Sequence, residues 1–396
     1  MREERSSPMK VLHYKSTMCL EEGGVVKAVL DLVRMGMRSD EVAVATMDPS
    51  GIPDEWQHSD DGSVCVHHLT GAPRRGMTLS ASQLGQMRKI ISENDVVHLH
   101  SMWNPANPQI AKLCIELGKP YVLSVHGMLD DWCMSQRRIK KVFYMKTWGR
   151  HLLQHATVVH CTAQAELDQA SKWFDRSKGV SVPLPFDLDE YETLPGSGLA
   201  YETFAELDRE KPKVLFLSRI NYKKGVDRLI RASALLHAKG VEHQLVIAGT
   251  GDEPYVEQMR SLARSEKIED QTYFLGFASG VPKVALLEAC DVFALPTSQE
   301  NFGFVFFEAL ASGTLVLTTK GTDTWPEIEG SGGGVIADNT PEAFADALQH
   351  ILGDLQQTHA MGQAGRSWVY REMTVDRVRQ QYRDMYQRCL SMGERS

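Results

Sequence analysis

Two glutamates, Glu300 and Glu308, have the spacing in this sequence that best suits ligand binding. Glu300 lies in a short polar turn after an apolar run, Gly303 follows it, and Glu308 lies about two turns further on in an apolar helical pattern. A junction of strand, turn and helix directs free backbone N–H groups and the positive end of the helix dipole toward an anion such as a diphosphate. Carboxylates accept paired hydrogen bonds from vicinal hydroxyls, so the pair suits a ligand with a sugar at one end and a ribose at the other.

Two cations, Arg219 and Lys224, lie in the segment 217–232 of the same half. Arg219 closes an apolar run, and Lys224 precedes Gly225, which opens a helical pattern. Both cations should therefore lie at the carboxyl edge of a parallel sheet, where α/β proteins bind ligands. A guanidinium and an ammonium can neutralise a departing diphosphate without a metal ion. A surface pair at a strand end is the alternative, and the glutamates in the same half favour the binding role.

The elements that must position these residues alternate regularly along the whole chain. Short β-branched runs alternate with longer helical patterns, which predicts an α/β fold of parallel sheets covered by crossover helices. The expected strands are 10–14, 41–46, 64–69, 96–100, 121–125, 157–161, 214–219, 244–249, 272–277, 292–297, 315–320 and 334–338. The two series predict two doubly wound, Rossmann-like domains.

The expected domain boundaries follow from a change in composition between the two series. We expect an N-terminal domain at 1–186, a hinge at 187–212 and a C-terminal domain at 213–372. The hinge stretch is acidic, lacks a strand pattern and is interrupted by proline and glycine. A final helix at 373–396 is expected to pack back on the N-terminal domain.

Composition excludes several classes of protein. The chain has 396 residues, with 43 basic and 51 acidic side chains and a net charge of −8, which argues against a nucleic-acid partner. Seven cysteines are dispersed without a CxxC pair, which is typical of reduced thiols in the cytoplasm. We expect no secretory signal and no membrane-spanning segment, because no apolar run approaches the required length of about 20 residues.

The sequence also lacks the signatures of several other chemistries. It contains no phosphate loop of the GxxxxGK[ST] type, no HExxH zinc helix and no GxSxG nucleophile elbow. Gly249 and Gly251 form a lone GxG, which is weak support for a dinucleotide site. Asp187 and Asp189 form a DxD triplet, but solvated linker charge is the better interpretation. We therefore expect no metal and no cofactor.

Together these motifs resemble those of the retaining glycosyltransferases of family 4, which have the GT-B fold of two Rossmann-like domains facing a central cleft. Glu300 and Glu308 match the family's E-x7-E element, and Arg219 and Lys224 match its R-x4-K-G element. The resemblance implies that Glu300 contacts the donor sugar and Glu308 the ribose hydroxyls. It also implies that Arg219 and Lys224 bind the diphosphate, and that His126, in a turn after a strand, lies near the transferred sugar.

The resemblance implies further donor contacts, made by Gly23, Gly24, Gly249, Gly251, Asn301, Phe302, Gly303, Phe304 and Val305. Gly23 and Gly24 resemble the family's glycine loop after the first strand. The sequence departs from the family before Glu327, where bulky residues replace a glycine-rich turn, so the role of Glu327 stays open. His13, His98 and His100, on expected strands, have no assigned role.

The segment 136–153 combines six basic residues with Phe143, Tyr144, Trp148 and Leu152. Such a basic amphipathic helix could lie on an anionic membrane and meet a lipid-linked acceptor, or it could be a crossover helix with a solvated basic face. The preceding stretch 126–132 resembles transferases that build bacterial surface polysaccharides. This resemblance favours a glycan acceptor.

The resulting hypothesis is a cytoplasmic, metal-independent hexosyltransferase of polysaccharide biosynthesis that uses a UDP- or GDP-linked sugar as co-substrate. The acceptor would be a hydroxyl of a glycan, a lipid-linked intermediate or a small molecule. Two alternatives stay open. One is a sugar-nucleotide epimerase of the same architecture, and the other is a sugar-nucleotide binding module without catalysis.

Overall fold

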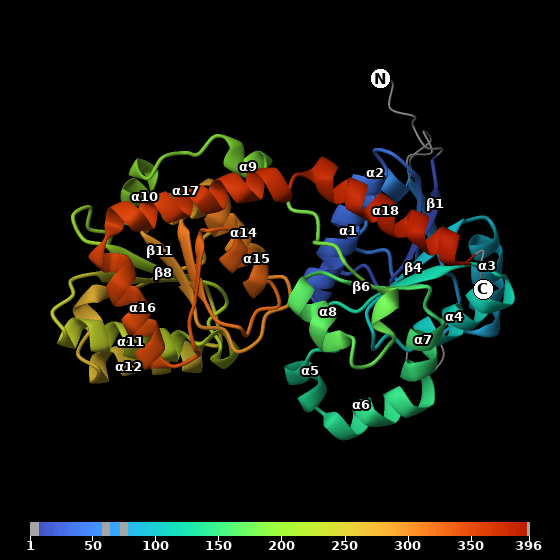
Figure 1. Ribbon diagram of the computed structural model, residues 1–396, viewed down its shortest axis with the longest axis horizontal. Helices are drawn as coiled ribbons and strands as arrows, with labels where there is room; N and C mark the ends of the chain where they lie inside the picture. The colour runs from blue at the N-terminus through green and yellow to red at the C-terminus, as the bar shows by residue number, and fades with distance from the viewer. Residues whose placement is uncertain (1–7, 58–63, 72–77, 394–396) are drawn as a thin grey trace. The chain divides into compact units, whose positions relative to one another are not determined.

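The computed structural model describes residues 8–57, 64–71 and 78–393, and its contacts divide the chain into two compact units (Figure 1). The first unit comprises Met1–Pro185 and Val375–Ser396, and the second comprises Phe186–Thr374. Each unit contains one parallel sheet, and each is described by itself below.

The first unit has a seven-stranded sheet with the strand order β3-β2-β1-β4-β5-β6-β7. Its strands are β1 (Lys10–Tyr14), β2 (Glu41–Thr46), β3 (Val64–His68), β4 (Val96–His100), β5 (Tyr121–Ser124), β6 (Val158–Cys161) and β7 (Gly179–Ser181). Its helices include α1 (Gly24–Gly36), α2 (Asp54–Gln57), α3 (Ala81–Ser92), α4 (Asn107–Glu116), α5 (Asp131–Ser135), α6 (Arg138–Tyr144), α7 (Arg150–His155), α8 (Gln164–Ala170) and α18 (Val375–Gly393). The order reverses between β1 and β4, which makes this the switch point of the sheet.

Successive side chains of the central strands of the first unit point to opposite faces of the sheet and so pack into two separate cores. Leu12 and Leu99 lie in the core beneath α3, α4 and α7, whereas Val11 and Val96 lie in the core beneath α1 and α18. The C-terminal helix α18 therefore closes one face of this sheet, as Figure 1 shows.

The second unit has a six-stranded sheet with the strand order β10-β9-β8-β11-β12-β13, so its switch point lies between β8 and β11. Its strands are β8 (Lys213–Leu217), β9 (Gln244–Ala248), β10 (Thr272–Gly276), β11 (Val292–Leu295), β12 (Leu315–Thr318) and β13 (Gly334–Ile336). Its helices include α9 (Asp189–Glu192), α10 (Gly198–Thr203), α11 (Val226–Ala238), α12 (Glu253–Ser265), α13 (Gly280–Ala289), α14 (Phe304–Ala311), α15 (Trp325–Gly330), α16 (Pro341–Gly353) and α17 (Leu355–Glu372).

The two doubly wound sheets confirm the predicted fold class, and each of the twelve expected strands forms within about two residues of its predicted bounds. The short edge strand β7 was not predicted. The expected hinge, 187–212, lies inside the second unit, because α10 packs on α13 and the backbone N–H of Gly196 donates to Glu288 at 2.8 Å. The second unit thus begins at Phe186 rather than at residue 213.

The basic segment 136–153 is less regular than the single helix expected there. It consists of α6, a π-helical turn at Met145–Gly149 and the start of α7. Met145 and Leu152 are buried and anchor the segment, whereas Phe143 and Trp148 are exposed. Within the described ranges, no helix combines the length and apolar character needed to cross a bilayer.

Candidate functional site

The predicted donor residues of the second unit gather at the carboxyl edge of its sheet, next to the switch point. Arg219 follows β8, Lys224 ends a short 3-10 turn at Tyr222–Lys224, and Glu300 follows β11. β8 and β11 are neighbours in the sheet, so the loops after them meet. The backbone N–H of Ser298 donates to the carbonyl of Lys223 at 2.8 Å and joins the two loops directly.

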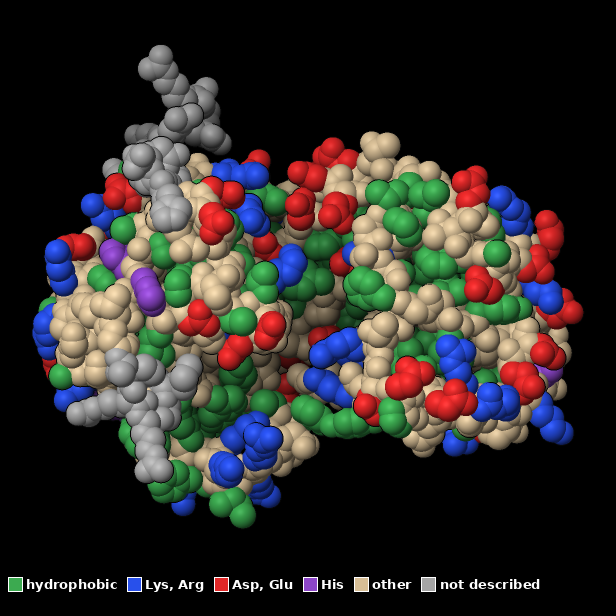
Figure 2. Space-filling view, turned by 180° about the vertical axis from the view of Figure 1, so that it is seen from behind, with side chains coloured by type: hydrophobic (Ala, Val, Ile, Leu, Met, Phe, Trp, Pro, Cys, Tyr) green, Lys and Arg blue, Asp and Glu red, His purple; other side chains and the backbone are tan. Residues whose placement is uncertain are grey.

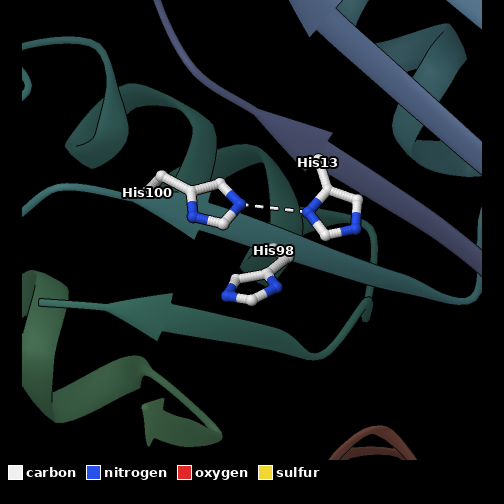
Figure 3. A group of neighbouring side chains, drawn as sticks. All are labelled: His13, His98 and His100. Carbon is white, nitrogen blue, oxygen red and sulfur yellow. Dashed lines mark hydrogen bonds between the residues drawn. The ribbon is translucent and has the colours of Figure 1, made fainter. Parts of the chain in front are cut away.

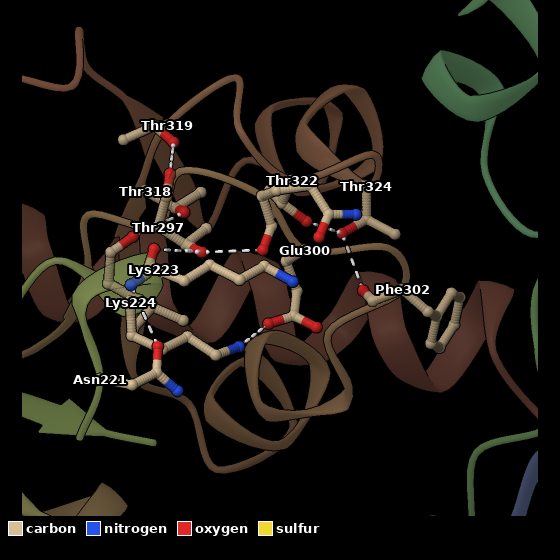
Figure 4. A network of polar contacts seen from close by, with 12 residues as sticks. Asn221, Lys223, Lys224, Thr297, Glu300, Phe302, Thr318, Thr319, Thr322 and Thr324 are labelled. Atoms are coloured by element: carbon tan, nitrogen blue, oxygen red, sulfur yellow. Dashed lines mark hydrogen bonds and ion pairs between the residues drawn. The ribbon is translucent and has the colours of Figure 1, made fainter. Parts of the chain in front are cut away.

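Lys224 and Glu300 form an ion pair in this edge, as Figure 4 shows. Lys224 is buried, and burial lowers its pKa to about 8. The positive charges of Lys223 and Arg219 lower the pKa of Lys224 in the same direction. The ammonium is therefore still charged at neutral pH, but it is less hydrated than a surface lysine and better suited to hold an anion.

The backbone on either side of Glu300 is fixed by the loop after β12. Glu300 donates its N–H to the carbonyl of Gly321 at 2.8 Å and accepts a hydrogen bond from the N–H of Asp323 at 2.9 Å. The Asn301 amide donates to the Asp323 carboxylate at 3.1 Å. These contacts fix the backbone that carries Glu300 at the edge of the sheet.

Gly303 occupies a position that only glycine tolerates, at the N-cap of α14. Its φ is +66°, and a Cβ there would lie 2.6 Å from the ring of Phe306 and 2.9 Å from Cγ of Glu300. The ring of Phe302 is buried and stacks on Phe307 with centroids 4.8 Å apart. The ring of Phe302 therefore packs inside the unit against α14 rather than facing a ligand. The half-buried Phe304 and Val305 begin the helix and present its first N–H groups.

Glu308 is paired with a lysine that the sequence patterns did not single out. Its carboxylate lies 3.1 Å from Nζ of Lys283 on α13, and both side chains are about four-fifths buried. Nothing in the sequence around Lys283 indicates this contact, because it depends on how α13 and α14 pack. The pair holds Glu308 in place five residues, or about one and a half turns, after the glycine of the N-cap.

Gly249 and Gly251 let the loop after β9 pack against the segment that carries Arg219. A Cβ on Gly249 would lie 1.9 Å from the carbonyl oxygen of Ser218, and one on Gly251 would lie 2.1 Å from that of Ile220. Both glycines are thus required by backbone packing alone. Arg219 itself is exposed, and no carboxylate of the described chain lies within ion-pair distance of it.

In the first unit, Gly23 and Gly24 lie where the chain passes from β1 into α1. Gly23 has a φ of +96° and caps α1, and nothing lies within 4 Å of a Cβ built on either glycine. Nearby, Lys15 and Glu22 form an ion pair at 3.5 Å. A hollow of about 490 Å³ lies beside this loop and is lined by Ser16, Thr17, Cys19, Glu21, Glu22, Met47 and Asp48.

His126 follows β5 in a left-handed conformation, with a φ of +51°, which is strained for a residue with a side chain. The buried carboxylate of Glu166 accepts hydrogen bonds from the N–H groups of Gly127 and Thr162 and so fixes this turn. Burial lowers the pKa of His126 to about 3, with smaller contributions from His160 and Lys15. The ring is therefore neutral at physiological pH.

The structure thus places Arg219, Lys224, Glu300 and the Gly303 turn at one sheet edge, and His126 and the glycine loop at the carboxyl edge of the other sheet. Glu327 lies in the first turn of α15, which follows the loop that holds Glu300. Sequence reasoning missed Lys283, which pairs with Glu308, and Glu166, which holds the turn after His126 through the N–H of Gly127.

Comparison with known proteins matches two family models to this chain. The model described as "Glycosyl transferases group 1" matches residues 202–368, and the model described as "Glycosyltransferase Family 4" matches residues 22–190. The two matches lie one in each half, over most of both sheets.

Individual relatives and solved structures agree with these matches. A GDP-mannose-dependent alpha-(1-6)-phosphatidylinositol monomannoside mannosyltransferase of Mycobacterium tuberculosis is 27% identical over 72% of this chain and 74% of its own. A D-inositol 3-phosphate glycosyltransferase of Corynebacterium aurimucosum is 33% identical over 61% of this chain and 58% of its own. The structure of Anabaena HepE in complex with UDP superposes with a TM-score of 0.77 at 20% identity, over 96% of this chain and all of that one.

Proposed function

Because the chain belongs to glycosyltransferase family 4 and has the GT-B fold, we propose that it transfers a hexose from a UDP- or GDP-linked sugar to an acceptor hydroxyl with retention of configuration. A named relative uses GDP-mannose, and the structural neighbour HepE was solved with UDP and with UDP-glucose, which supports both nucleotides as candidates. The proposed acceptor is a glycan or a lipid-linked intermediate of polysaccharide biosynthesis. The observation that carries the proposal is the buried ion pair of Lys224 and Glu300 beside Arg219 at the switch point.

In this proposal the second unit binds the donor without a metal ion or other cofactor. Arg219 and Lys224 neutralise the negative charge that grows on the diphosphate as the bond between the anomeric carbon and the phosphate oxygen breaks. The first N–H groups of α14, after Gly303, donate to the phosphate or the sugar. Glu300 accepts hydrogen bonds from sugar hydroxyls, and Glu308 accepts them from the ribose.

The acceptor oxygen attacks the anomeric carbon from the face that the diphosphate leaves, and the departing phosphate oxygen takes the acceptor's proton. His126 is neutral, so it contributes a hydrogen bond to the transferred sugar rather than a positive charge. Gly23 and Gly24 have the open surroundings that close approach of a substrate to the backbone requires.

The proposal is tested first by binding and then by turnover. UDP-glucose, GDP-mannose and related donors are screened by thermal shift, since a bound donor raises apparent stability. Release of the nucleoside diphosphate is then followed with glycan and lipid-linked acceptors. Arg219→Met and Glu300→Gln should each lower turnover about 100-fold, the usual cost of removing one group that stabilises a transition state.

Matched controls come from the exposed ion pair of Arg264 and Glu257 on α12. Arg264→Met and Glu257→Gln change the same residue types without touching the site and should leave turnover unchanged. If both site variants keep turnover within threefold of the parent, the site assignment is wrong. If the donor alone is converted to a different sugar, the protein is an epimerase and not a transferase.

We also propose that the protein works in the cytoplasm, where its seven free thiols stay reduced, and that the surface of α6 and the adjoining turn contacts an anionic membrane. Ile139, Phe143 and Trp148 are 87%, 61% and 50% exposed and lie among the basic residues of this segment. Figure 2 shows basic and hydrophobic side chains together on the projecting lower edge of the first unit. Exposed rings among cations favour the interface of an anionic bilayer.

The membrane contact is tested by flotation with vesicles of phosphatidylglycerol and of phosphatidylcholine. Binding should occur to the anionic vesicles only and should be lost in the double variant Phe143→Ser and Trp148→Ser. Phe277→Ser is the matched control, because Phe277 is even more exposed, at 74%, but lies in the second unit. Equal binding to both lipids, or none to either, would refute the contact.

A further inference from the structure

Five buried histidines and a serine form one cluster on the sheet of the first unit, partly beneath α18, and the sheet register explains why. His13 on β1 lies opposite His98 on β4, and His100, two residues further along β4, points to the same face. Ser124 on β5 pairs with His100 on one side and with His160 on the other. Figure 3 shows His13, His98 and His100 together on the two central strands.

One hydrogen-bonded chain through this cluster has a fixed direction. His160 Nε2 lies 2.8 Å from the carbonyl oxygen of Val182, which can only accept, so Nε2 carries the proton and Nδ1 is an acceptor. Ser124 therefore donates to His160 Nδ1 at 2.6 Å and accepts from His98 Nε2 at 2.6 Å. His98 Nδ1 then accepts from the hydroxyl of Tyr386 at 2.9 Å. Both nitrogens of His98 are thus occupied.

A second chain links His126 to the interior. His126 Nε2 lies 3.2 Å from His100 Nδ1, and His100 Nε2 lies 3.0 Å from His13 Nδ1. The three rings form a stack, with planes inclined by 29° and by 12° at the two steps. Burial lowers the pKa of His13 and of His126 to about 3 and that of His100 well below its usual value. All three rings are therefore neutral.

Neutrality makes the three tautomers depend on one another. A neutral imidazole has one donor and one acceptor nitrogen, and His100 uses both of its nitrogens within the chain. If His126 donates from Nε2, then His100 must donate from Nε2 to His13, which also carries its proton on Nε2. In the reverse direction all three carry the proton on Nδ1. The chain thus has only two satisfied arrangements, and in each the three histidines share one tautomer.

We propose that His100 and His13 are positioning residues that hold the ring of His126 and couple its tautomer to their own, so that the state of the chain decides whether Nδ1 of His126 accepts or donates a hydrogen bond. The inference deepens the proposed function, because it rests on His126 meeting a hydroxyl of the transferred sugar. A hydroxyl can donate or accept, but a ring held in one tautomer accommodates only one of the two orientations. The interior of the sheet would thus select how the sugar is held.

A metal ion is the competing use of the same residues. The ligand atoms of His13, His98 and His100 lie within 4.8 Å of one another, and among the residues that the structure describes they form the one group spaced for a metal. Binding there would break the hydrogen bond between His13 and His100 and detach His98 from Tyr386 or Ser124. The satisfied hydrogen bonds favour the tautomer chain.

The direct test is nitrogen NMR of the ligand-free, full-length protein labelled with ¹⁵N in its histidine rings. The shifts of the two ring nitrogens distinguish the tautomers, and assignments come from single substitutions. We expect His13, His100 and His126 to share one tautomer, with His98 and His160 protonated on Nε2. Different tautomers among the first three, or a stoichiometric transition metal in the purified protein, would overturn the proposal.

A second test separates positioning from packing. His13→Phe keeps a ring but removes the hydrogen bond to His100, and should change the ¹⁵N signature of His126 and lower kcat about fivefold, the value of one hydrogen bond. His13→Asn restores a donor or acceptor near the former Nδ1 and should recover both readouts. Tyr386→Phe is the matched control. Tyr386 lines the same cavity of about 20 Å³ as His13, but its hydroxyl belongs to the other series of hydrogen bonds, the one that runs through His98.

The outcomes distinguish this inference from the proposed function. If His126→Ala leaves turnover unchanged while the three tautomers agree, the chain exists but His126 does not serve the sugar. If His126→Ala lowers turnover while His13→Phe alters neither the signature of His126 nor kcat, the positioning role is wrong and the proposed function stands. Equal losses in His13→Phe and Tyr386→Phe would show a packing defect and also refute the inference.

Discussion

The lowered pKa of Lys224 predicts that nucleotide affinity falls in mild alkali. Lys224 is buried and titrates at about pH 8, so its charge is lost within a range where the protein can be studied. The perturbation is a change of pH from 7 to 9, compared between the parent and the variant Lys224→Arg. An arginine keeps its charge over this whole range, because its pKa is above about 12.

The magnitude follows from the protonated fraction of Lys224. With a pKa of about 8, about nine-tenths of the side chain is charged at pH 7 and about one-tenth at pH 9. If only the ammonium form holds the diphosphate, the affinity for UDP or GDP should fall about tenfold over this range, or about 1.4 kcal/mol. The terminal phosphate of the ligand ionises at about pH 6, so it does not contribute to the change.

The assay is isothermal titration calorimetry with whichever of UDP and GDP binds more tightly. Lys224→Arg should bind equally at pH 7 and pH 9, and Lys223→Arg, which keeps a cation at the neighbouring position, should behave like the parent. Lys223→Gln should move the loss of affinity to higher pH, because Lys223 is one of the charges that lower the pKa of Lys224. Constant affinity in the parent from pH 7 to 9 would refute the reasoning, as would the same loss in Lys224→Arg.

Two further predictions concern stability. Gly303→Ala should lower the free energy of unfolding by about 2 kcal/mol in urea, because a positive φ and a clash with Phe306 must both be relieved, whereas Gly353→Ala, with open space around it, should change it little. Arg383→Ala should cost about 3 kcal/mol in the same assay, because it leaves the buried carboxylate of Asp40 without the partner that now lies 2.6 Å away. The error of such a measurement is about 0.5 kcal/mol. A loss smaller than this in either variant would contradict the structural reason given for that variant.

Much of the fold could be predicted from the sequence because parallel strands are short, continuous apolar runs. The run 214–217 and the run 292–295 have this form, and both are fully buried strands at the switch point. The residues that follow such strands must lie at the carboxyl edge, so the positions of Arg219 and Glu300 followed from chain direction alone. The prediction needed no knowledge of side-chain packing.

The contacts that tune the site could not be predicted in the same way. Lys283 pairs with Glu308 across two helices, and Glu166 reaches Gly127 from the helix after the next strand. Both depend on the rotation of one element against another, which hydrophobic periodicity leaves undetermined. The stretch 187–212 was mistaken for a hinge for a related reason, because its polar composition resembles a linker although α10 packs on α13.

The pairing of both site glutamates with lysines changes what the charges of the donor site can do. Glu300 is held by Lys224 and Glu308 by Lys283, so each carboxylate is neutralised before a ligand arrives. Two negative charges at this edge would otherwise repel a diphosphate. With both paired, the first attraction on a diphosphate would come from Arg219 and from the N-terminus of α14, and Lys224 would add its charge once it turns from Glu300 to the phosphate. A diphosphate that draws Lys224 toward itself must loosen Glu300, and a sugar hydroxyl must then take the place of the ammonium. In the proposed site, binding of the phosphate and orientation of the sugar would therefore be coupled through one ion pair, that of Lys224 and Glu300.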